Sequence, residues 1–373
     1  MSALDPRRYG RLLGIGVLAL ALVAACAPGP AAGPSAPPPA AAPAAPQAAA
    51  AAAPPPAPAR VRPVSMRLDW LFQGPNAGFM VAKDKGYYDQ MGLDVTIGAG
   101  QGSGSTAQII ANKADQIGFS DGYTVAASVA NGMGIKMVAG IYRRNPTAAV
   151  VLADSGINSP KDLEGKSMGI PTGGAGFTQW PAFAKGCGVD ADRVQVVNID
   201  PAAAPATLLQ RRVDGIAGFA QGFVPSIEIK GGQAARILWF ADCGVDVVSN
   251  GIIVHNDLLR DDPALVRDFV AASIKGFLYA RQQPDEAVEI VQKFSSTVDL
   301  AIAKREMELS WQTWVTPNTA GQPLGWMAEK DWQATVDILR QYGGVAAPPE
   351  PREIYTNELV PTGAEFVPPS ATS

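Results

Sequence analysis

Between Leu68 and Gly98 the spacing of apolar residues changes from alternation to helical periodicity and back again. Residues 66–70 alternate apolar and polar side chains, as a half-buried strand does. Residues 79–87 carry apolar side chains at the spacing of one helix face, and residues 93–97 alternate again. The pattern therefore predicts a strand, a helix that ends at Gly86, and a second strand.

Similar patterns continue along the chain and predict an α/β fold, because strands alternate with helices. The expected strands occupy residues 114–120, 135–141, 150–152, 167–170, 194–199, 213–219, 237–240 and 247–255. The expected helices occupy residues 107–112, 123–130, 179–186, 206–212, 263–283, 284–294, 301–314 and 329–342.

The loop from Trp70 to Gly78 follows the first expected strand and carries aromatic and amide side chains. In open α/β sheets, ligands bind outside the carboxyl ends of the strands. We therefore expect this loop to contact a ligand through Trp70, Phe72, Gln73 and Asn76.

Two glycine-rich loops lie between a strand and a helix, at residues 98–108 and 171–177. Hydroxyl side chains at a helix start cap its free amides, and those amides also attract electron-rich ligand groups. In the first loop we expect ligand contacts from Ser103, Ser105 and Thr106, with helix capping alone as the alternative. In the second loop the candidates are Thr172, Gly173, Gly174 and Phe177, with a purely structural turn as the alternative.

Two strand ends resemble each other, because Ser120 to Tyr123 and Ala220 to Phe223 each follow a short apolar strand. Asp121 is expected either to accept hydrogen bonds from a ligand amine or to cap the helix that follows, and Tyr123 is expected to stack on a ligand. By correspondence, Phe219 and Gln221 are candidate ligand contacts.

Tyr142, Arg143 and Arg144 follow the expected strand at residues 135–141. Tyr142 is a further candidate ligand contact. The paired arginines are either an anion-binding pair or part of a solvated crossing between two lobes.

The first residues have the pattern of an export signal. Arg7, Arg8 and Arg11 precede an apolar run at residues 12–25, which is too short to span a bilayer permanently. The run ends in two alanines and Cys26, which resembles the bacterial lipobox. We expect residues 1–25 to be a lipoprotein signal peptide and Cys26 to be lipidated, with an ordinary secretory signal as the alternative.

Residues 26–63 are dominated by alanine and proline. Proline keeps such a segment extended, so we expect a semi-rigid tether to the membrane. A tail without a function is the alternative.

Composition removes several classes of function. Charged residues make up 17% of the chain, the net charge is -4, and no basic block appears, so a nucleic-acid partner is not expected. The single histidine, His255, excludes a multi-histidine metal site and leaves little material for Ser-His or Cys-His catalysis. We expect His255 to be a surface or capping residue, and we expect no cofactor and no metal.

Two cysteines remain after Cys26. Cys187 and Cys243 could pair in an oxidising compartment, but two isolated cysteines do not make a disulfide framework. We therefore expect buried free thiols.

The segment from Leu68 to Val95 resembles the opening of the THI5/NMT1-like periplasmic binding proteins. The matching residues are Leu68, Asp69, Trp70, Ala77, Gly78, Val81, Ala82, Lys83, Lys85, Gly86, Tyr87, Gly92, Leu93, Asp94 and Val95. The resemblance implies a type II periplasmic binding protein with two lobes and two hinge crossings. Pyrimidine-binding members typically have Pro-Asn and then His in the ligand loop, whereas this chain has Phe72-Gln73 and then Asn76.

With that resemblance, we expect residues 64–146 and 250–360 to form the first lobe. Residues 147–249 should form the second lobe, and residues 361–373 an irregular tail.

The family consists of solute receptors of ABC importers, so the resemblance implies a permease and an ATPase as partners. We expect an exported, lipid-anchored monomer that binds a small molecule, first a thiamine-type pyrimidine precursor. Riboflavin or another flat heterocycle is the next candidate, followed by a sulfonate such as taurine held by the helix starts and Arg143 or Arg144. The pyrimidine synthase that shares this fold is not expected, because this chain lacks its cysteine cluster and ligand-loop histidine; a sensor without a transporter stays open.

Overall fold

A computed structural model describes Gly33, residues 61–345 and residues 347–369. The expected signal peptide, the lipidation site Cys26 and most of the tether at 26–63 lie outside the described residues and stay predictions. Within the described part, no helix combines the length and the apolar character that crossing a bilayer requires.

The chain forms two mixed five-stranded sheets. The first has the order β2 (Leu93–Gly98), β1 (Arg62–Arg67), β3 (Ile117–Asp121), β10 (Asn250–His255) and β4 (Ile135–Gly140). The second has the order β7 (Gln195–Val197), β6 (Ser167–Gly169), β8 (Gly215–Phe219), β5 (Thr147–Leu152) and β9 (Ala235–Trp239). The chain thus crosses between sheets after β4 and again before β10, which confirms the predicted two-lobed α/β architecture.

Each sheet contains one strand that runs antiparallel to both of its neighbours. In the first sheet this strand is β10, which pairs with β3 and β4. In the second sheet it is β5, which pairs with β8 and β9. These are the strands on which the chain arrives from the other sheet, so the antiparallel pairs mark the crossings.

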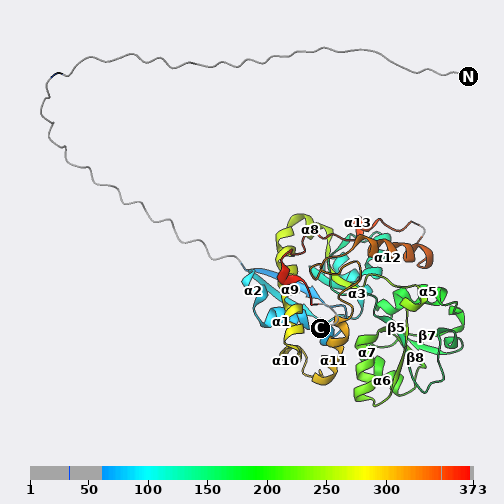
Figure 1. Cartoon of the computed structure of the whole chain (residues 1–373). Coiled ribbons are helices and arrows are strands. Elements are labelled where there is room, and N and C mark those ends of the chain that lie inside the picture. Colours follow the sequence, from blue (N-terminus) through cyan, green and yellow to red (C-terminus); the bar gives the residue numbers. More distant parts are fainter. Residues whose placement is uncertain (1–32, 34–60, 346, 370–373) are drawn as a thin grey trace, which may run out of the picture. The chain divides into compact units, whose positions relative to one another are not determined.

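Helices cover both sheets (Figure 1). With the first sheet belong α1 (Ala77–Asp84), α2 (Tyr87–Gln90), α3 (Ser103–Ala111), α4 (Gly122–Ala130), α8 (Asn256–Asp261), α9 (Pro263–Gln282), α10 (Pro284–Phe294), α11 (Leu300–Trp311), α12 (Glu329–Tyr342) and α13 (Pro351–Ile354). With the second sheet, drawn in green, belong α5 (Ala175–Gly186), α6 (Ala204–Leu209) and α7 (Ala220–Pro225). We call these groups the first and second lobes.

Local sequence explains where several helices begin and end. Gly86 adopts a φ of 70° after α1, a conformation that costs glycine little. The Asp262 side chain accepts a hydrogen bond from the Leu265 amide, and Pro263 occupies the first position of α9. His255 caps α8 by accepting from the Asp257 amide at 3.0 Å, which confirms its predicted capping role.

Two expected boundaries change. β1 begins at Arg62, so the last residues of the predicted tether belong to the first sheet, and β1 ends at Arg67, before Asp69 and Trp70. The strand ends early because the carbonyls of Asp69 and Trp70 accept hydrogen bonds from the glycine-rich loop, at Gly102 and Gly100. The predicted tail also has a packed part, since Phe366 is buried in the core of the first lobe.

The prediction of free thiols is wrong, because Cys187 and Cys243 form a disulfide with a Cα–Cα distance of 4.9 Å. Cys187 ends α5, and Cys243 lies in the turn that follows β9. A Cβ atom added to Gly186 would lie 2.1 Å from the Cys243 carbonyl oxygen, so glycine permits this close approach. Because the two cysteines are 56 residues apart in the sequence, no local pattern predicted their contact, which forms only in the folded chain.

The disulfide should contribute measurably to stability. A loop of this length corresponds to about 4 kcal/mol of lost chain entropy in the unfolded state. We expect reductant to lower the urea midpoint of the native chain and to leave that of the Cys187→Ser/Cys243→Ser double variant unchanged. Two reactive thiols at these positions in the unreduced, unfolded chain would contradict the disulfide.

Candidate functional site

The two crossing segments lie side by side and form a hinge. The amides of Ile141 and Tyr142 both donate to the Asn250 carbonyl, at 2.9 and 2.8 Å. The Ser249 amide donates in turn to the Tyr142 carbonyl at 3.1 Å. The lobes are therefore joined by main-chain bonds between the crossings, which positions the cleft between them.

The two glycine-rich loops contact each other across the cleft. The Gly104 amide donates to the Gly173 carbonyl at 2.9 Å. Gly102 adopts a φ of 130°, and a Cβ atom at this position would lie 2.1 Å from the Gly173 carbonyl oxygen. Because glycine occupies these positions, the two main chains can meet.

Helix α3 begins earlier than the sequence suggests, so its predicted hydroxyl cap is wrong. Gly102 is the N-cap residue and provides no side-chain bond, while Ser103, Ser105 and Thr106 lie within the helix. The Thr106 hydroxyl instead donates to the Leu68 carbonyl at 2.8 Å and fixes the helix to the end of β1.

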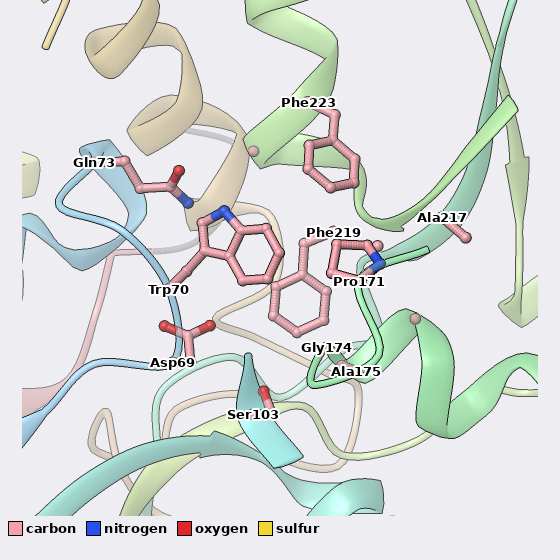
Figure 2. A pocket seen from close by; sticks show the side chains of 13 residues that line it. Asp69, Trp70, Gln73, Ser103, Pro171, Gly174, Ala175, Ala217, Phe219 and Phe223 are labelled. Atoms are coloured by element: carbon pink, nitrogen blue, oxygen red, sulfur yellow. The ribbon is translucent and has the colours of Figure 1, made fainter. Parts of the chain in front are cut away.

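A pocket lies between the lobes beside this contact, and we call it the inner pocket (Figure 2). It is lined from the first lobe by Asp69, Trp70, Gln73 and Ser103, and from the second by Pro171, Gly174, Ala175, Gly176, Ala217, Gly218, Phe219, Gly222 and Phe223. The Trp70 indole packs edge-on against the Phe223 ring, with 6.2 Å between ring centroids. The walls are thus mainly apolar, with aromatic rings from Trp70, Phe219 and Phe223, and Asp69 is the only ionisable residue among the lining residues.

The free volume of the inner pocket is about 30 Å³, which is enough for a water molecule. A small-molecule site usually offers several hundred Å³. Because the lining residues come from both lobes, separating the lobes would enlarge the pocket. The described conformation is therefore a closed one.

A larger hollow of about 420 Å³ adjoins the inner pocket, and we call it the outer chamber. Trp70, Gln73, Gly222 and Phe223 line both spaces. The outer chamber is more polar than the inner pocket, and its lining includes Ser226, Lys230, Ser295, Thr297, Asp299 and Glu306. A molecule longer than a single ring could therefore extend from one space into the other.

The structure brings only some of the predicted residues together. The inner pocket contains Trp70, Gln73, Ser103, Gly174 and Phe219, and the outer chamber adds Phe72. A separate hollow of about 430 Å³ is lined by Ser105, Thr172, Gly173 and Phe177. Gln221 lines a further hollow beside the hinge. Five predicted residues line none of these four spaces: Asn76, Thr106, Asp121, Tyr123 and Tyr142.

Asp121 has structural partners. Its Oδ1 accepts from the Thr124 amide at 2.9 Å and so caps α4, one of the two predicted alternatives. The same atom accepts from Gln179 Nε2 of the second lobe at 3.2 Å, and Gln179 bonds with Asn145 at the hinge. Burial raises the pKa of Asp121 to about 6. Asp121 therefore connects the lobes by a polar chain behind the pocket.

Asp69 is buried at the inner pocket, with 5% of its surface exposed. Its Oδ2 accepts from Asn250 Nδ2 at 2.7 Å, and its Oδ1 has no hydrogen-bond partner among the described residues. Burial raises the pKa of Asp69 to about 7 against the opposing effect of the Asn250 bond. The pocket therefore contains a carboxyl group with one unused oxygen.

Glu306 is a second buried acid, on α11 at the outer chamber. Its Oε2 accepts from the Gly74 amide at 3.2 Å. Burial raises the pKa of Glu306 to about 8, so the folded chain favours its neutral form at neutral pH.

Comparison with known proteins shows the family of this chain. The family model described as NMT1/THI5 like matches residues 74–287, which is more than half of the chain. The chain belongs to this family.

Named relatives and a solved structure agree with the fold. The riboflavin-binding protein RibY of Chloroflexus aurantiacus is 28% identical, over 95% of this chain and 99% of its own. The formylaminopyrimidine-binding protein of Halalkalibacterium halodurans is 22% identical, over 76% of this chain and 87% of its own. The alkanesulfonate-binding protein SsuA of Xanthomonas axonopodis pv. citri, solved bound to MOPS, has a TM-score of 0.63 at 14% identity and covers 80% of this chain and 99% of its own. The chain thus shares its family with named binding proteins and its fold with a solved binding protein.

Asp69 lines the inner pocket but was not among the ligand contacts predicted from the sequence. It lies next to Trp70 in the segment from Leu68 to Val95 that resembles the family. Because it alternates with apolar neighbours, the pattern indicated a strand residue and not a ligand contact. Pro171 and Phe223 were missed for a similar reason, since each adjoins a predicted contact and has no distinctive chemistry of its own. Only the tertiary structure shows which neighbours face the cleft.

Arg143 is buried and is part of the hinge. Its Nε donates to the Trp314 carbonyl, and its Nη1 donates to the carbonyls of Pro323 and Trp326, both at 3.1 Å. Burial lowers the pKa of Arg143 to about 10. Its donors therefore fasten the segment between α11 and α12 to the first crossing.

The raised pKa of Glu306 predicts a pH dependence of stability. A carboxyl group whose pKa rises on folding stabilises the folded state below about pH 4.5, and this contribution disappears as pH rises to about 8. We expect Glu306→Gln to reduce the loss of unfolding free energy between pH 5.5 and pH 8 by about 3 kcal/mol. Urea unfolding at both pH values measures it.

The matched control is Glu308→Gln on the same helix, where the side chain pairs with Arg305. This variant should keep the native difference between the two pH values. An unchanged difference in Glu306→Gln would show that Glu306 does not titrate as described.

Proposed function

We propose that this chain is the substrate-binding lipoprotein of an ABC importer and captures a flat heteroaromatic nutrient between its lobes. The observation that carries the proposal is the inner pocket, where aromatic rings from both lobes and one buried carboxyl group line the same space. Flat rings gain area burial and ring-ring contact from such walls. A ligand that touches both lobes binds the closed state better than the open one and so shifts the population toward closure.

Riboflavin is the first candidate ligand. The similarity to RibY extends over nearly the whole chain, and the inner pocket continues into the polar outer chamber. A flavin ring in the inner pocket would leave its hydroxyl-rich chain in the outer chamber. This order reverses the ranking from the sequence, which placed a thiamine-type pyrimidine first.

A thiamine-type pyrimidine precursor is the second candidate. The small inner pocket favours it, because a single ring requires less separation of the lobes than a flavin does. The similarity to the formylaminopyrimidine-binding protein also supports this choice.

A sulfonate is a poorer match to the site. The only ionisable residue that lines the inner pocket is an acid, which disfavours an anion. Arg143 already donates to three carbonyls, and Arg144 lines the hollow beside the hinge. Nη2 of Arg143 has no hydrogen-bond partner among the described residues, but neither arginine lines the inner pocket or the outer chamber.

The synthase alternative also finds little support at the site. Cys187 and Cys243 are bonded to each other, and the His255 Nδ1 accepts from a backbone amide. None of these residues lines the inner pocket or the outer chamber. We therefore propose that the chain is a receptor and not an enzyme.

We propose the membrane context from the sequence. Cys26 would carry the lipid, residues 26–61 would tether the receptor outside the cytoplasmic membrane, and a permease and an ATPase would receive the ligand from a monomer. The expected result is incorporation of labelled fatty acid into the chain in an expressing bacterium and no incorporation into Cys26→Ala. Equal labelling of both chains would contradict lipidation at Cys26.

The aromatic pocket is tested by replacing Trp70. We expect Trp70→Ala to weaken binding of riboflavin about 30-fold, because central aromatic contacts typically contribute 2 kcal/mol or more. Trp70→Phe should retain most of the affinity. Titration followed by flavin fluorescence measures both, and the pyrimidine is tested in parallel by calorimetry.

Trp239→Ala is the control, since Trp239 lies on β9 and lines neither the inner pocket nor the outer chamber. It should bind like the native chain. Native affinity in Trp70→Ala would remove Trp70 from the site, and a native chain that binds neither heterocycle would refute the proposed ligand class.

A further inference from the structure

The main chain holds Asp69 rigidly at the wall of the inner pocket. Its carbonyl accepts from the Gly102 amide at 2.7 Å, and its Oδ2 accepts from Asn250 Nδ2. The backbone contact joins it to the first glycine-rich loop, and the side-chain contact joins it to β10 near the hinge. Figure 2 shows the carboxyl group below the Trp70 indole, on the side of the pocket where Ser103 lies.

Asp69 combines a place on the inner pocket wall with a carboxyl oxygen that has no hydrogen-bond partner among the described residues; Asp121 Oδ2 also lacks one, but Asp121 does not line the pocket. The Asp69 oxygen without a partner is Oδ1, which is buried. Asn76 lies close enough to favour the ionised form, but its Nδ2 donates to the Leu71 carbonyl at 3.4 Å. A buried acceptor without a partner destabilises the folded state, and more so when it is charged. A ligand that donates to Oδ1 would remove this cost.

Few other ionisable groups act on Asp69. Asp121, from the end of β3, disfavours its ionised form. Tyr142, from the first crossing, is buried, and the charge of Asp69 raises the pKa of its hydroxyl further. Asp69 itself is the only ionisable residue on the inner pocket wall.

We propose that Asp69 determines specificity by accepting a hydrogen bond from a ring N–H or an exocyclic amine at the edge of the bound heterocycle. The inference rests on the proposed function and narrows it to heterocycles that carry such a donor. Ser103 and Gln73 line the same pocket and can donate to the ring oxygens or nitrogens beside that donor.

The two candidate ligands both satisfy this requirement. Riboflavin carries an imide N–H between two carbonyl groups, and the aminopyrimidine precursors carry an exocyclic amine. A methyl group on the imide nitrogen removes the donor and adds bulk where Oδ1 lies. Riboflavin and 3-methylriboflavin therefore form a matched pair of probes.

Proton linkage provides a second signature. The ionised form of Asp69 accepts the ligand N–H, and a pKa of about 7 leaves it mostly neutral at pH 6. Binding at pH 6 then releases the carboxyl proton to solvent. The ionised fraction falls roughly tenfold from pH 8 to pH 6, so affinity should fall by about the same factor.

The experiment measures riboflavin and 3-methylriboflavin binding to the native chain and to Asp69→Asn at pH 6 and pH 8. We expect Asp69→Asn to bind riboflavin roughly 10- to 100-fold more weakly at pH 8 and to lose the pH dependence. The amide keeps an oxygen for Asn250 and turns a donor toward the ligand. Methylation should weaken binding to the native chain much more than binding to the variant.

Asp115→Asn is the control, because this acid pairs with Arg67 on the same lobe and lines none of the four spaces. It should keep the native affinity, methyl effect and pH profile. If Asp69→Asn does not fold, two measurements on the native chain test the role of Asp69. One is the loss of affinity on methylation of the ligand, and the other is the number of protons released on binding, measured by calorimetry in two buffers.

The outcomes separate the two proposals. Riboflavin binding that is insensitive to methylation and pH would overturn the role of Asp69 and leave the heterocycle receptor standing. If the chain binds only the aminopyrimidine precursor, this precursor takes the place of riboflavin in the experiment. Its binding is then compared with that of an analogue methylated on the exocyclic amine, at the same two pH values. Failure of the native chain to bind either heterocycle would overturn both proposals.

Discussion

The site depends on a main-chain contact between two glycine-rich loops. The Gly104 amide of one lobe donates to the Gly173 carbonyl of the other, and this approach requires the absence of a side chain at Gly102 and Gly173. A Cβ atom at Gly173 would lie 2.3 Å from Ser105 Oγ. With the loops in contact, Trp70 from one lobe faces Phe223 from the other, and the aromatic pocket exists only because these two walls meet.

Several buried acids lie around this cleft. Asp69, Asp121 and Glu306 all have raised pKa values, chiefly because burial disfavours their charged forms. Each of Asp69 and Asp121 has one buried oxygen without a hydrogen-bond partner among the described residues. Asp121 uses its other oxygen on the helix cap and on Gln179 and lines none of the four spaces, whereas Asp69 lines the inner pocket. Asp121 thus contributes to closure itself, and Asp69 leaves a polar contact for a ligand to complete. This division gives the closed state a reason to depend on what occupies the pocket.

The sequence predicted the architecture well because periodicity and turn residues are local signals. The order strand–helix–strand around Gly86, the helix at residues 329–342 and the two crossings appear as expected, although the first strand lies earlier, at Arg62–Arg67. The prediction failed where distant segments meet. For Asp121 the sequence left a ligand contact and a helix cap open; the Thr124 amide shows the cap, and the contact with Gln179 across the lobes was not predicted. The pairing of Cys187 with Cys243 and the position of Asp69 likewise depend on tertiary contacts that no local pattern records.

In the proposed complex the ligand lies between the lobes, against the aromatic wall and Asp69. A crystal structure of the chain grown with riboflavin tests this most directly, with a crystal grown with the aminopyrimidine precursor beside it. We predict that the ring lies between Trp70 and the Phe219 and Phe223 side chains, with its donor edge at Asp69 Oδ1. A ring bound in the hollow lined by Ser105 and Phe177, or on one lobe alone, would contradict the account.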